Sequence, residues 1–308
     1  MKTITLGKSS LQSARLAYGC WRIAKTEEAG RTSGRAAILA AIEAGYTLFD
    51  HADIYGEGRA EAAFGAVLRE TPALRRKILI ATKCGIRREG EPTPAATYRY
   101  DFSADYIIRS CEGSLRRLAV ETIDLFQLHR PDWLMDPHDV VAAFEQLRRQ
   151  GKACEFGVSN FRPSQVTLLQ KACPFPLVVN QVEISLARLI CFEDGTLDQC
   201  QTEQITPLAW SPLAGGKLAE GAHRLLPWQE NYRLDSVVAE LDAQARGLGT
   251  TRGNVALAWL LKHPAGIVPL VGSTRPEKIH EAVQAEQINL SREQWYRLLE
   301  AARGERLP

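Results

Sequence analysis

Short apolar runs alternate with amphipathic helical patterns along the whole chain. Eight runs have the length and composition of buried strands, at residues 16–23, 47–53, 78–85, 124–130, 154–160, 177–184, 206–213 and 266–273. The clearest helical patterns between them lie at residues 35–45, 59–70, 106–119 and 140–151. Several of these helical patterns end in glycine or basic residues, as helix C-termini prefer. Such alternation is typical of α/β proteins with a parallel sheet.

No Pro-, Gly- or Ser-rich linker and no change of composition interrupts the repeated strand-helix units. We therefore predict one domain over residues 1–308 that folds as a (β/α)8 TIM barrel. A doubly wound sheet is the alternative, but the Gly-x-Gly-x-x-Gly turn expected after an early strand of that fold is missing.

Three further segments are predicted outside the repeated units. The segments "KTITL" and "ARLAYG" around "GKSS" predict an N-terminal hairpin that plugs one end of the barrel. Residues 215–233 read as an irregular insertion after the seventh strand. Residues 291–302 predict an extra C-terminal helix, with Ser291 as its N-cap and Glu293 nearby.

Composition and charge exclude several classes of protein. The 38 basic and 36 acidic residues give a net charge of +2, which does not indicate a nucleic-acid or membrane surface. The seven cysteines contain no Cys-x-x-Cys pair, which argues against a disulfide framework and a zinc ribbon. No window approaches the roughly 20 apolar residues of a membrane span, and the N-terminus lacks a signal-peptide core. We expect a soluble, unprocessed cytoplasmic protein with no metal site and no obligatory protein partner.

Polar and aromatic side chains stand where the apolar runs stop, and the carboxyl ends of the strands are where such barrels place their active sites. These residues are Trp21, Asp50, Tyr55, Lys83, His129, Ser159, Asn160, Gln181, Trp210, Ser211 and Ser273. Each taken alone has a structural interpretation, as a helix cap, a packed ring or a buried histidine. A Tyr, a Lys, an Asp and a His at neighbouring strand ends are harder to explain by capping and packing alone.

That set of four residues predicts acid catalysis. A phenol has a pKa near ~10 and is a poor acid at neutral pH, but an ammonium such as Lys83 stabilises the phenolate. Asp50 would keep that lysine charged, and His129 would donate a hydrogen bond to a substrate oxygen. Together these four residues would act as a proton donor for a carbonyl oxygen, which suits carbonyl reduction with a hydride source.

The motifs around these residues resemble the aldo-keto reductase family. "FDHADIYG" is similar to the family signature Asp-(Ser/Thr)-Ala-x-x-Tyr-Gly, and "ATKCG", "LHRPD", "GVSNF", "NQVEIS" and "WSPLAGG" follow in the family's order. The resemblance covers nearly the whole chain and is greatest to the bacterial YdhF-type branch. It implies that Tyr55 is the general acid, that Lys83 and Asp50 tune it, and that His129 orients the carbonyl. His51, in place of Ser or Thr, and Asp53 are interpreted as local scaffolding.

The same resemblance implies a nicotinamide cofactor. Ser159, Asn160 and Gln181 would hold the carboxamide, and Trp210 would stack on the ring. The remaining expected cofactor contacts are Trp21, Ser211, Leu213, Gly215, Gly216, Ser273, Arg275, Lys278 and Glu281. In "GSTRPEKIHEA" a family Lys becomes Gly272, an Arg becomes Lys278 and an Asn becomes Ala282, while Arg275 can replace the missing charge. We therefore expect NADP(H) to be preferred over NAD(H), less strongly than in relatives with the full Lys and Arg pair.

The leading hypothesis is an NADP-dependent oxidoreductase that reduces aldehyde or ketone substrates. One alternative is a non-catalytic nicotinamide-nucleotide-binding regulatory subunit, which the complete Asp, Tyr, Lys and His set disfavours. Another is a barrel that acts on a phosphorylated metabolite without nicotinamide, which the Ser159, Asn160 and Gln181 set disfavours. The aromatic residues Trp21, Trp133, Trp228 and Tyr232 are candidates for an apolar pocket wall, although loop aromatics often pack for structural reasons.

Overall fold

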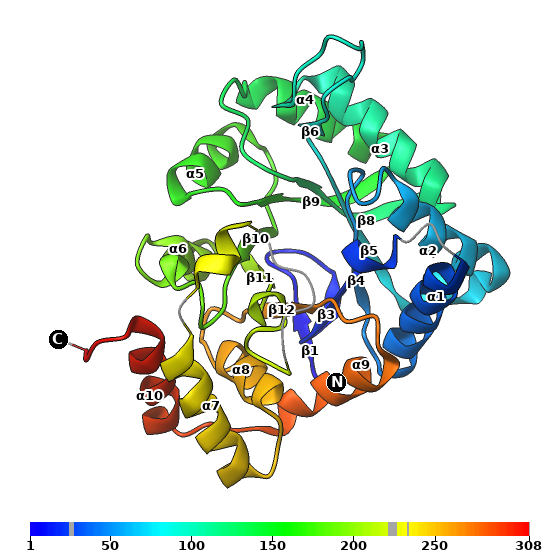
Figure 1. Cartoon of the computed structure of the whole chain (residues 1–308). Helices are drawn as coiled ribbons and strands as arrows, with labels where there is room; N and C mark the ends of the chain where they lie inside the picture. The colour runs from blue at the N-terminus through cyan, green and yellow to red at the C-terminus, as the bar shows by residue number, and fades with distance from the viewer. Residues whose placement is uncertain (25–27, 221–226, 233, 308) are drawn as a thin grey trace.

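A closed barrel of eight parallel strands forms the centre of the molecule (Figure 1), in a computed structural model that describes residues 1–24, 28–220, 227–232 and 234–307. The barrel strands are β3 (Ala17–Gly19), β4 (Leu48–Asp50), β5 (Leu79–Cys84), β8 (Ile123–Leu128), β9 (Ala153–Ser159), β10 (Val179–Glu183), β11 (Thr206–Trp210) and β12 (Val268–Val271). β12 pairs with β3, with Leu270 opposite Ala17, so the last strand closes the barrel on the first. The predicted (β/α)8 barrel is confirmed.

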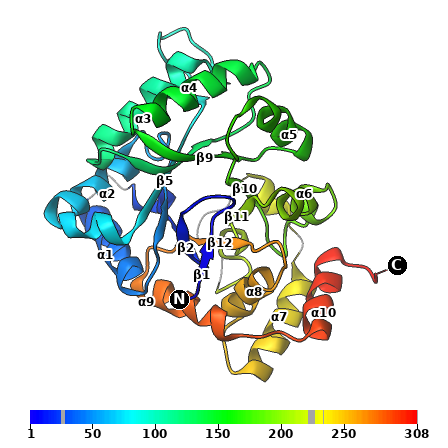
Figure 2. The same cartoon turned by 180° about the vertical axis from the view of Figure 1, so that it is seen from behind.

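Helices surround the barrel on its outside (Figure 2). They are α1 (Glu28–Glu43), α2 (Arg59–Glu70), α3 (Ala104–Leu118), α4 (Pro137–Arg149), α5 (Pro163–Ala172), α6 (Thr196–Glu203), α7 (Asp235–Leu248), α8 (Arg252–Leu261), α9 (Pro276–Ala282) and α10 (Arg292–Arg303). Most of them pack an apolar face on the outward side chains of the strands; Phe64 of α2, for example, lies 5.1 Å from Phe49 of β4 between ring centroids. Helix α7 instead packs on α8, and α10 packs on α7. This burial of one face per helix is what the 3.6-residue pattern predicts.

Local signals set the ends of the helices. Pro137 occupies the first turn of α4, and the Asp136 side chain accepts a hydrogen bond from the backbone N–H of His138 at 2.8 Å. After α4 the chain turns at Gly151, whose φ of 68° is in the left-handed region that glycine adopts readily. At α10, Ser291 is the N-cap and forms a capping box with Gln294, not with the neighbouring Glu293.

The N-terminal hairpin closes the end of the barrel where the strands begin. β1 (Thr3–Thr5) pairs antiparallel with β2 (Gln12–Ala14). Leu6 and Leu11 between them pack against side chains near the strand starts, including Leu48, Leu125 and Val268. The predicted plug is therefore confirmed, but its second arm is Gln12–Ala14, which shares only Ala14 with "ARLAYG". The rest of that segment includes Ala17–Gly19, the strand that closes the barrel.

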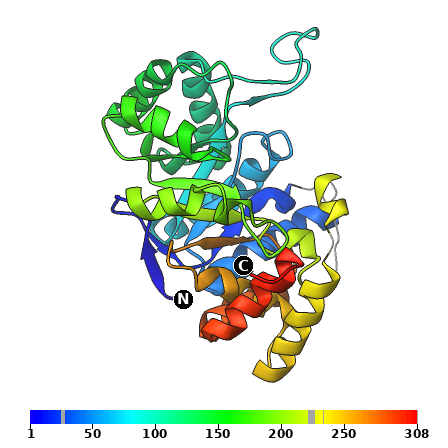
Figure 3. The same cartoon turned by 90° about the vertical axis from the view of Figure 1, so that its left-hand side faces the viewer.

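Most barrel strands are shorter than the apolar runs that predicted them, as β3 and β4 show. β3 stops at Gly19 and continues as the 3-10 helix η1 (Cys20–Ile23), and β4 stops at Asp50. Apolar composition continues beyond both strands because the following turns are also buried, so it does not mark their ends. The side view in Figure 3 shows the N-terminal hairpin (dark blue) at one end of the barrel.

Several short elements complete the described part of the chain. The small ladder of β6 (Ile86–Arg87) and β7 (Arg99–Tyr100) was not predicted, because two-residue strands carry no detectable alternation. The 3-10 helices are η2 (Pro72–Lys77), η3 (Ile190–Phe192), η4 (Ala214–Gly216), η5 (Pro227–Asn231) and η6 (Val283–Gln287). The predicted insertion at 215–233 contains part of η4 and all of η5, while its residues 221–226 and 233 lie outside the described residues.

The seven cysteines are all free thiols, and only Cys154 is exposed. Across the described ranges, no helix is both long enough and apolar enough to cross a membrane.

Candidate active site

A buried ion pair lies at the carboxyl ends of β4 and β5. The Nζ atom of Lys83 is 2.7 and 2.8 Å from the two carboxylate oxygens of Asp50, and it also donates to the backbone oxygen of His51 at 2.7 Å. The Lys83 side chain is fully buried. Burial alone would lower the pKa of Lys83, but Asp50 and Tyr55 outweigh it and raise that pKa above its ordinary value. Lys83 is therefore an ammonium at neutral pH.

Tyr55 lies directly beside this pair, in the turn that follows β4. The Lys83 ammonium is 5.1 Å from the centroid of the Tyr55 ring, and the His129 ring stands edge-on to it at 5.8 Å. Burial raises the pKa of Tyr55, and Asp50 adds to this, while Lys83 acts in the opposite direction. Lysine alone would lower the pKa of Tyr55, as the sequence predicts, but in the folded chain burial outweighs that effect. The phenol therefore keeps its proton at neutral pH.

His129 follows β8 and is held by its backbone, whose N–H donates to the backbone oxygen of Cys84 at 2.8 Å. Burial, with the nearby charges of Lys83 and Arg130, puts the pKa of His129 well below its usual range. The imidazole is therefore neutral and carries a single N–H. Its Nδ1 atom is buried and makes no hydrogen bond with a described residue.

A chain of hydrogen bonds connects residues at the carboxyl ends of β9, β10 and β11 to this group. The indole N–H of Trp210 donates to Asn160 Oδ1 at 3.0 Å, and Asn160 Nδ2 donates to Ser159 Oγ at 2.9 Å. Ser159 in turn donates to the backbone oxygen of Gln181, and Gln181 Nε2 donates to Asp50 Oδ1 at 2.8 Å. Sequence reasoning missed the Gln181–Asp50 contact, since no local pattern joins residues 131 positions apart.

The residues present fit a nicotinamide dinucleotide. Gln181 Oε1 makes no hydrogen bond with a described residue, so it can accept from a carboxamide, and its second amide hydrogen is available as a donor. After β11, the residues Ser211, Ala214, Gly215 and Gly216 all have positive φ, between 48° and 107°. The backbone N–H groups of Ala214 and Gly216 donate to the backbone oxygens of Ser211 and Leu213 at 2.9 and 2.8 Å. The fit to a pyrophosphate therefore rests on Gly215 and Gly216, which carry no side chain and let it come close.

The residues predicted to bind the 2′-phosphate of the cofactor lie in the loop after β12 and in α9. Ser273 Oγ accepts the backbone N–H of Arg275 at 3.2 Å. The Arg275 guanidinium lies 3.2 Å from a carboxylate oxygen of Glu220, and Lys278 forms ion pairs with both Glu220 and Glu281. Sequence reasoning missed Glu220, which comes from the loop after β11 and occupies both cations.

His51 and Asp53 form no side-chain hydrogen bond with Asp50, Tyr55, Lys83 or His129. The buried His51 ring packs edge-on against Phe64 at 4.7 Å, and burial lowers its pKa to about 3. Asp53 accepts a hydrogen bond from Ser110 Oγ at 2.7 Å on the side of α3, and burial raises its pKa to about 7. Both positions agree with the scaffolding interpretation.

The aromatic residues around the barrel mouth do not form one apolar wall. Trp228 stands edge-on to Trp210 at 6.4 Å, but its indole N–H donates to the buried carboxylate of Glu183 at 3.1 Å, as does the Tyr232 hydroxyl at 3.3 Å. Trp21 lies 6.5 Å from the Tyr55 ring. Glu183 was not predicted; its carboxylate anchors the segment after β11 to β10.

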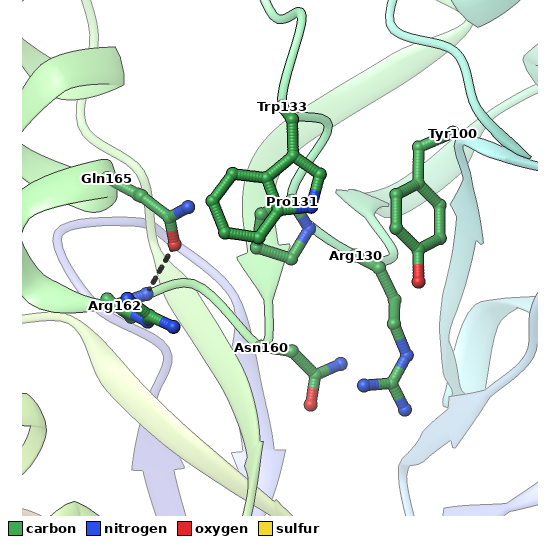
Figure 4. A pocket seen from close by; sticks show the side chains of 7 residues that line it. All are labelled: Tyr100, Arg130, Pro131, Trp133, Asn160, Arg162 and Gln165. Carbon is green, nitrogen blue, oxygen red and sulfur yellow. Dashed lines mark hydrogen bonds between the residues drawn. The ribbon is translucent and has the colours of Figure 1, made fainter.

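Trp133 lies on the other side of the mouth, with 78% of its surface exposed. It borders a cavity of about 180 Å³ that also contacts the side chains of Arg130 and Arg162 (Figure 4). Here Trp133 and Pro131 share the lining with two arginines and two amide side chains, so an apolar wall does not describe it.

Comparison with known proteins places this geometry in context. The model of the Aldo/keto reductase family matches residues 15–303. The 6-dehydroglucose reductase of Novosphingobium aromaticivorans is 43% identical over 98% of this chain and 96% of the relative, and Oxidoreductase YdhF of Escherichia coli is 39% identical over the full length of both. The crystal structure of a thermostable aldo-keto reductase with the inhibitor epalrestat superposes with a TM-score of 0.82, at 25% identity, over 98% of this chain and 100% of that one.

Proposed function

Because the chain belongs to the aldo/keto reductase family, we propose that it is an NADPH-dependent reductase that converts aldehyde or ketone carbonyls to alcohols. The main observation behind this proposal is the buried Lys83–Asp50 ion pair, which lies next to the ring of Tyr55. Membership of the family and oxidoreductase-named relatives support carbonyl reduction and a nicotinamide cofactor in general. The choice of NADPH and the roles of individual residues are part of the proposal.

Tyr55 is the proposed proton donor. Its raised pKa keeps the phenol protonated until negative charge develops on the carbonyl oxygen. The Lys83 ammonium, 5.1 Å from the ring, then stabilises the phenolate as the proton leaves. Asp50 holds Lys83 in place, and Gln181 holds Asp50. When bound, the nicotinamide supplies the hydride that the carbonyl carbon receives.

His129 is the proposed orienting group. A neutral imidazole at this position can donate its one N–H to the carbonyl oxygen without competing with Tyr55 for the acid role. Its low pKa, caused by burial and by two neighbouring cations, prevents it from holding a second proton at neutral pH. The carbonyl oxygen would thus accept two hydrogen bonds, from the phenol and the imidazole, and the geometry for proton transfer would be fixed.

The cofactor would lie across the carboxyl ends of β9 to β12. Ser159, Asn160 and Gln181 would hold the carboxamide, and the indole of Trp210 would pack on the ring. The hydrogen bond from Trp210 to Asn160 sets the orientation of both side chains. Trp21 and Ser211 would border the nicotinamide end, and Leu213, Gly215 and Gly216 would pass under the pyrophosphate.

The names of the relatives suggest a polar aldehyde as substrate. Proteins called 6-dehydroglucose reductase from Novosphingobium aromaticivorans and Agrobacterium fabrum are 43% and 39% identical to this chain. A sugar-derived aldehyde suits a mouth that presents Arg130, Asn160 and Gln165 to a small molecule. We therefore place small hydrophilic aldehydes ahead of apolar ketones.

The test is NADPH oxidation by the purified protein over a panel of aldehydes, ketones and dicarbonyls, in parallel with Tyr55→Phe. Loss of the proton donor should lower turnover by on the order of 10² or more, because general acids contribute that much. NADPH affinity, measured by fluorescence titration, should barely change because the ring remains. Tyr296→Phe on the exposed face of α10 is the control and should match the wild type.

Near-wild-type turnover of Tyr55→Phe on a good substrate would show that another group donates the proton. A wild-type protein that binds NADPH tightly but reduces nothing in the panel would instead favour a regulatory nucleotide-binding role.

A further inference from the structure

A cavity of about 180 Å³ lies next to the proposed catalytic residues, at the carboxyl ends of β8 and β9. Its polar lining comes from Tyr100, Arg130, Asn160, Arg162 and Gln165, beneath Trp133 (Figure 4). Two guanidinium groups therefore face one small space, and no carboxylate of a described residue lines it. Asn160, which lines the cavity, donates through its Nδ2 atom to the backbone oxygen of His129 at 3.0 Å, so the cavity adjoins the place where a carbonyl would bind.

Neither arginine has an acidic partner within the described part of the chain. Arg130 is half-buried, and its guanidinium lies 5.9 Å from the centroid of the Trp210 ring. Asp132, the nearest carboxylate in sequence, accepts hydrogen bonds from the backbone N–H groups of Phe102 and Leu134 at 3.0 and 2.9 Å. A partly buried cation without a counter-ion is unfavourable, and an anionic ligand would relieve this cost.

We propose that this cavity binds an oxoanionic substituent of the substrate, a carboxylate or phosphate, and that Arg130 and Arg162 determine specificity for it. The inference rests on the proposed reductase function and names its substrate class. A guanidinium matches a carboxylate or phosphate with two parallel N–H donors. Gln165 adds a donor, because its Oε1 atom is occupied by the backbone N–H of Arg162 and its Nε2 atom is not.

The size and place of the cavity fit one substituent, not a whole ligand. Complete ligand sites measure roughly 300–1,000 Å³, so about 180 Å³ accommodates only one end of a substrate whose carbonyl reaches His129. The cations expected to contact the cofactor phosphate stand after β12. In the barrel order β12 is separated from β9 by β11 and β10, which places those cations on another side of the mouth. Arg130 and Arg162 are therefore placed to bind the substrate and not the cofactor phosphate.

The experiment compares 4-oxobutanoate with its methyl ester, two aldehydes that differ mainly in one negative charge. In the wild type, kcat/KM for the acid should exceed that for the ester by about 10-fold or more, the value expected of a charge-assisted pair. Arg130→Gln and Arg162→Gln should each bring this ratio toward one, and high salt should narrow it in the wild type. Arg149→Gln removes an exposed arginine of α4 and should keep the ratio.

Equal kcat/KM for acid and ester in the wild type would overturn the anion site and leave the reductase function standing. If the protein reduces neither compound, calorimetric titration of succinate into the NADP⁺-loaded protein decides the question separately. Binding that Arg130→Gln or Arg162→Gln weakens at least 10-fold, and Arg149→Gln does not, supports the site. Absence of binding to the wild type overturns it. Because Arg162 is exposed, its variant keeps the test valid should Arg130→Gln fail to fold.

Discussion

His51 is a fully buried histidine whose two ring nitrogens make no hydrogen bond with a described residue. Its backbone oxygen accepts from Lys83, so the position supports the proposed site through the main chain and not through the imidazole. Burial, reinforced by the Lys83 charge, lowers its pKa from 6.5 to about 3. The ring is thus a neutral packing group that must be charged when the chain unfolds in acid.

This residue predicts a specific loss of stability in acid. Between pH 6.5 and about 3 the unfolded chain binds a proton at His51 and the folded chain does not, so the free energy of unfolding falls as the pH falls through that window. From pH 7 to pH 5 the contribution of this one group is about 2 kcal/mol. His51→Leu, which keeps an apolar group against Phe64, should show a shallower decline in urea unfolding between these pH values.

The exposed His138 gives the matched comparison, and His138→Asn should keep the wild-type pH dependence. An unchanged slope in His51→Leu would mean that the buried ring is protonated in the folded state, contrary to its surroundings.

At the level of elements, the junction of β12 and α9 sets the expected cofactor preference. Arg275 and Lys278 stand at the start of α9, where backbone amides also favour an anion. Glu220 from the loop after β11 pairs with both cations, and Glu281 pairs with Lys278. Glu277 also lies 3.7 Å from Arg275, so three carboxylates surround the two cations. A 2′-phosphate must therefore compete with them, and we expect a modest preference for NADPH.

Removing the cations and removing the competing carboxylate should change the preference for NADPH over NADH in opposite directions. Arg275→Ala combined with Lys278→Ala should weaken NADPH binding by on the order of 10-fold and leave NADH nearly unchanged, because only NADPH carries the extra phosphate. Glu220→Gln removes the competing charge and should raise the ratio of NADPH to NADH affinity. Fluorescence titrations with both cofactors at low salt measure each ratio.

Equal losses of affinity for NADPH and NADH in the double variant would show that these cations do not distinguish the two cofactors by the 2′-phosphate. A wild type that prefers NADH would contradict the proposed cofactor itself.

At the level of the whole molecule, one end of the barrel holds the proposed active site and the other end is closed by the N-terminal hairpin. The proposed site occupies the carboxyl ends of the strands, while the hairpin of β1 and β2 closes the opposite end through Leu6 and Leu11. Gly7 in this hairpin has a φ of 53°, and a Cβ atom there would lie 2.4 Å from the backbone oxygen of Val178. The hairpin therefore fits the barrel so closely that an added methyl group must displace main chain.

Gly7→Ala should for this reason lower stability without changing the chemistry. Gly151 is the matched control, since its φ of 68° carries the same conformational cost but a Cβ there meets nothing within 4 Å. Gly7→Ala should reduce the free energy of unfolding by about 1–3 kcal/mol more than Gly151→Ala, the range for overpacking. Chemical denaturation measures this difference, and kcat/KM per folded molecule should stay at the wild-type value. A parallel loss of activity in the folded fraction would show that the two ends are coupled.

Local patterns in the sequence were sufficient to predict the eight barrel strands, the four helices named in advance, the hairpin and the C-terminal helix. Hydrophobic periodicity reports which face of a segment is buried, and turn chemistry reports where it stops, so both can be read within a few residues. The motifs at the strand ends also identified Asp50, Tyr55, Lys83 and His129 as candidates, because parallel strands bring their carboxyl ends to one face. The predicted roles of these residues in catalysis await the experiments above.

Other features were decided only by the tertiary structure. The Gln181–Asp50 hydrogen bond, the pairing of Glu220 with Arg275 and Lys278, and the anchoring of Trp228 by Glu183 join segments that are far apart in the chain. The net shift of the Tyr55 pKa also has the opposite sign from the effect of lysine alone. Desolvation and Coulomb energies depend on distances and burial that arise only when the barrel closes, and no local pattern carries them.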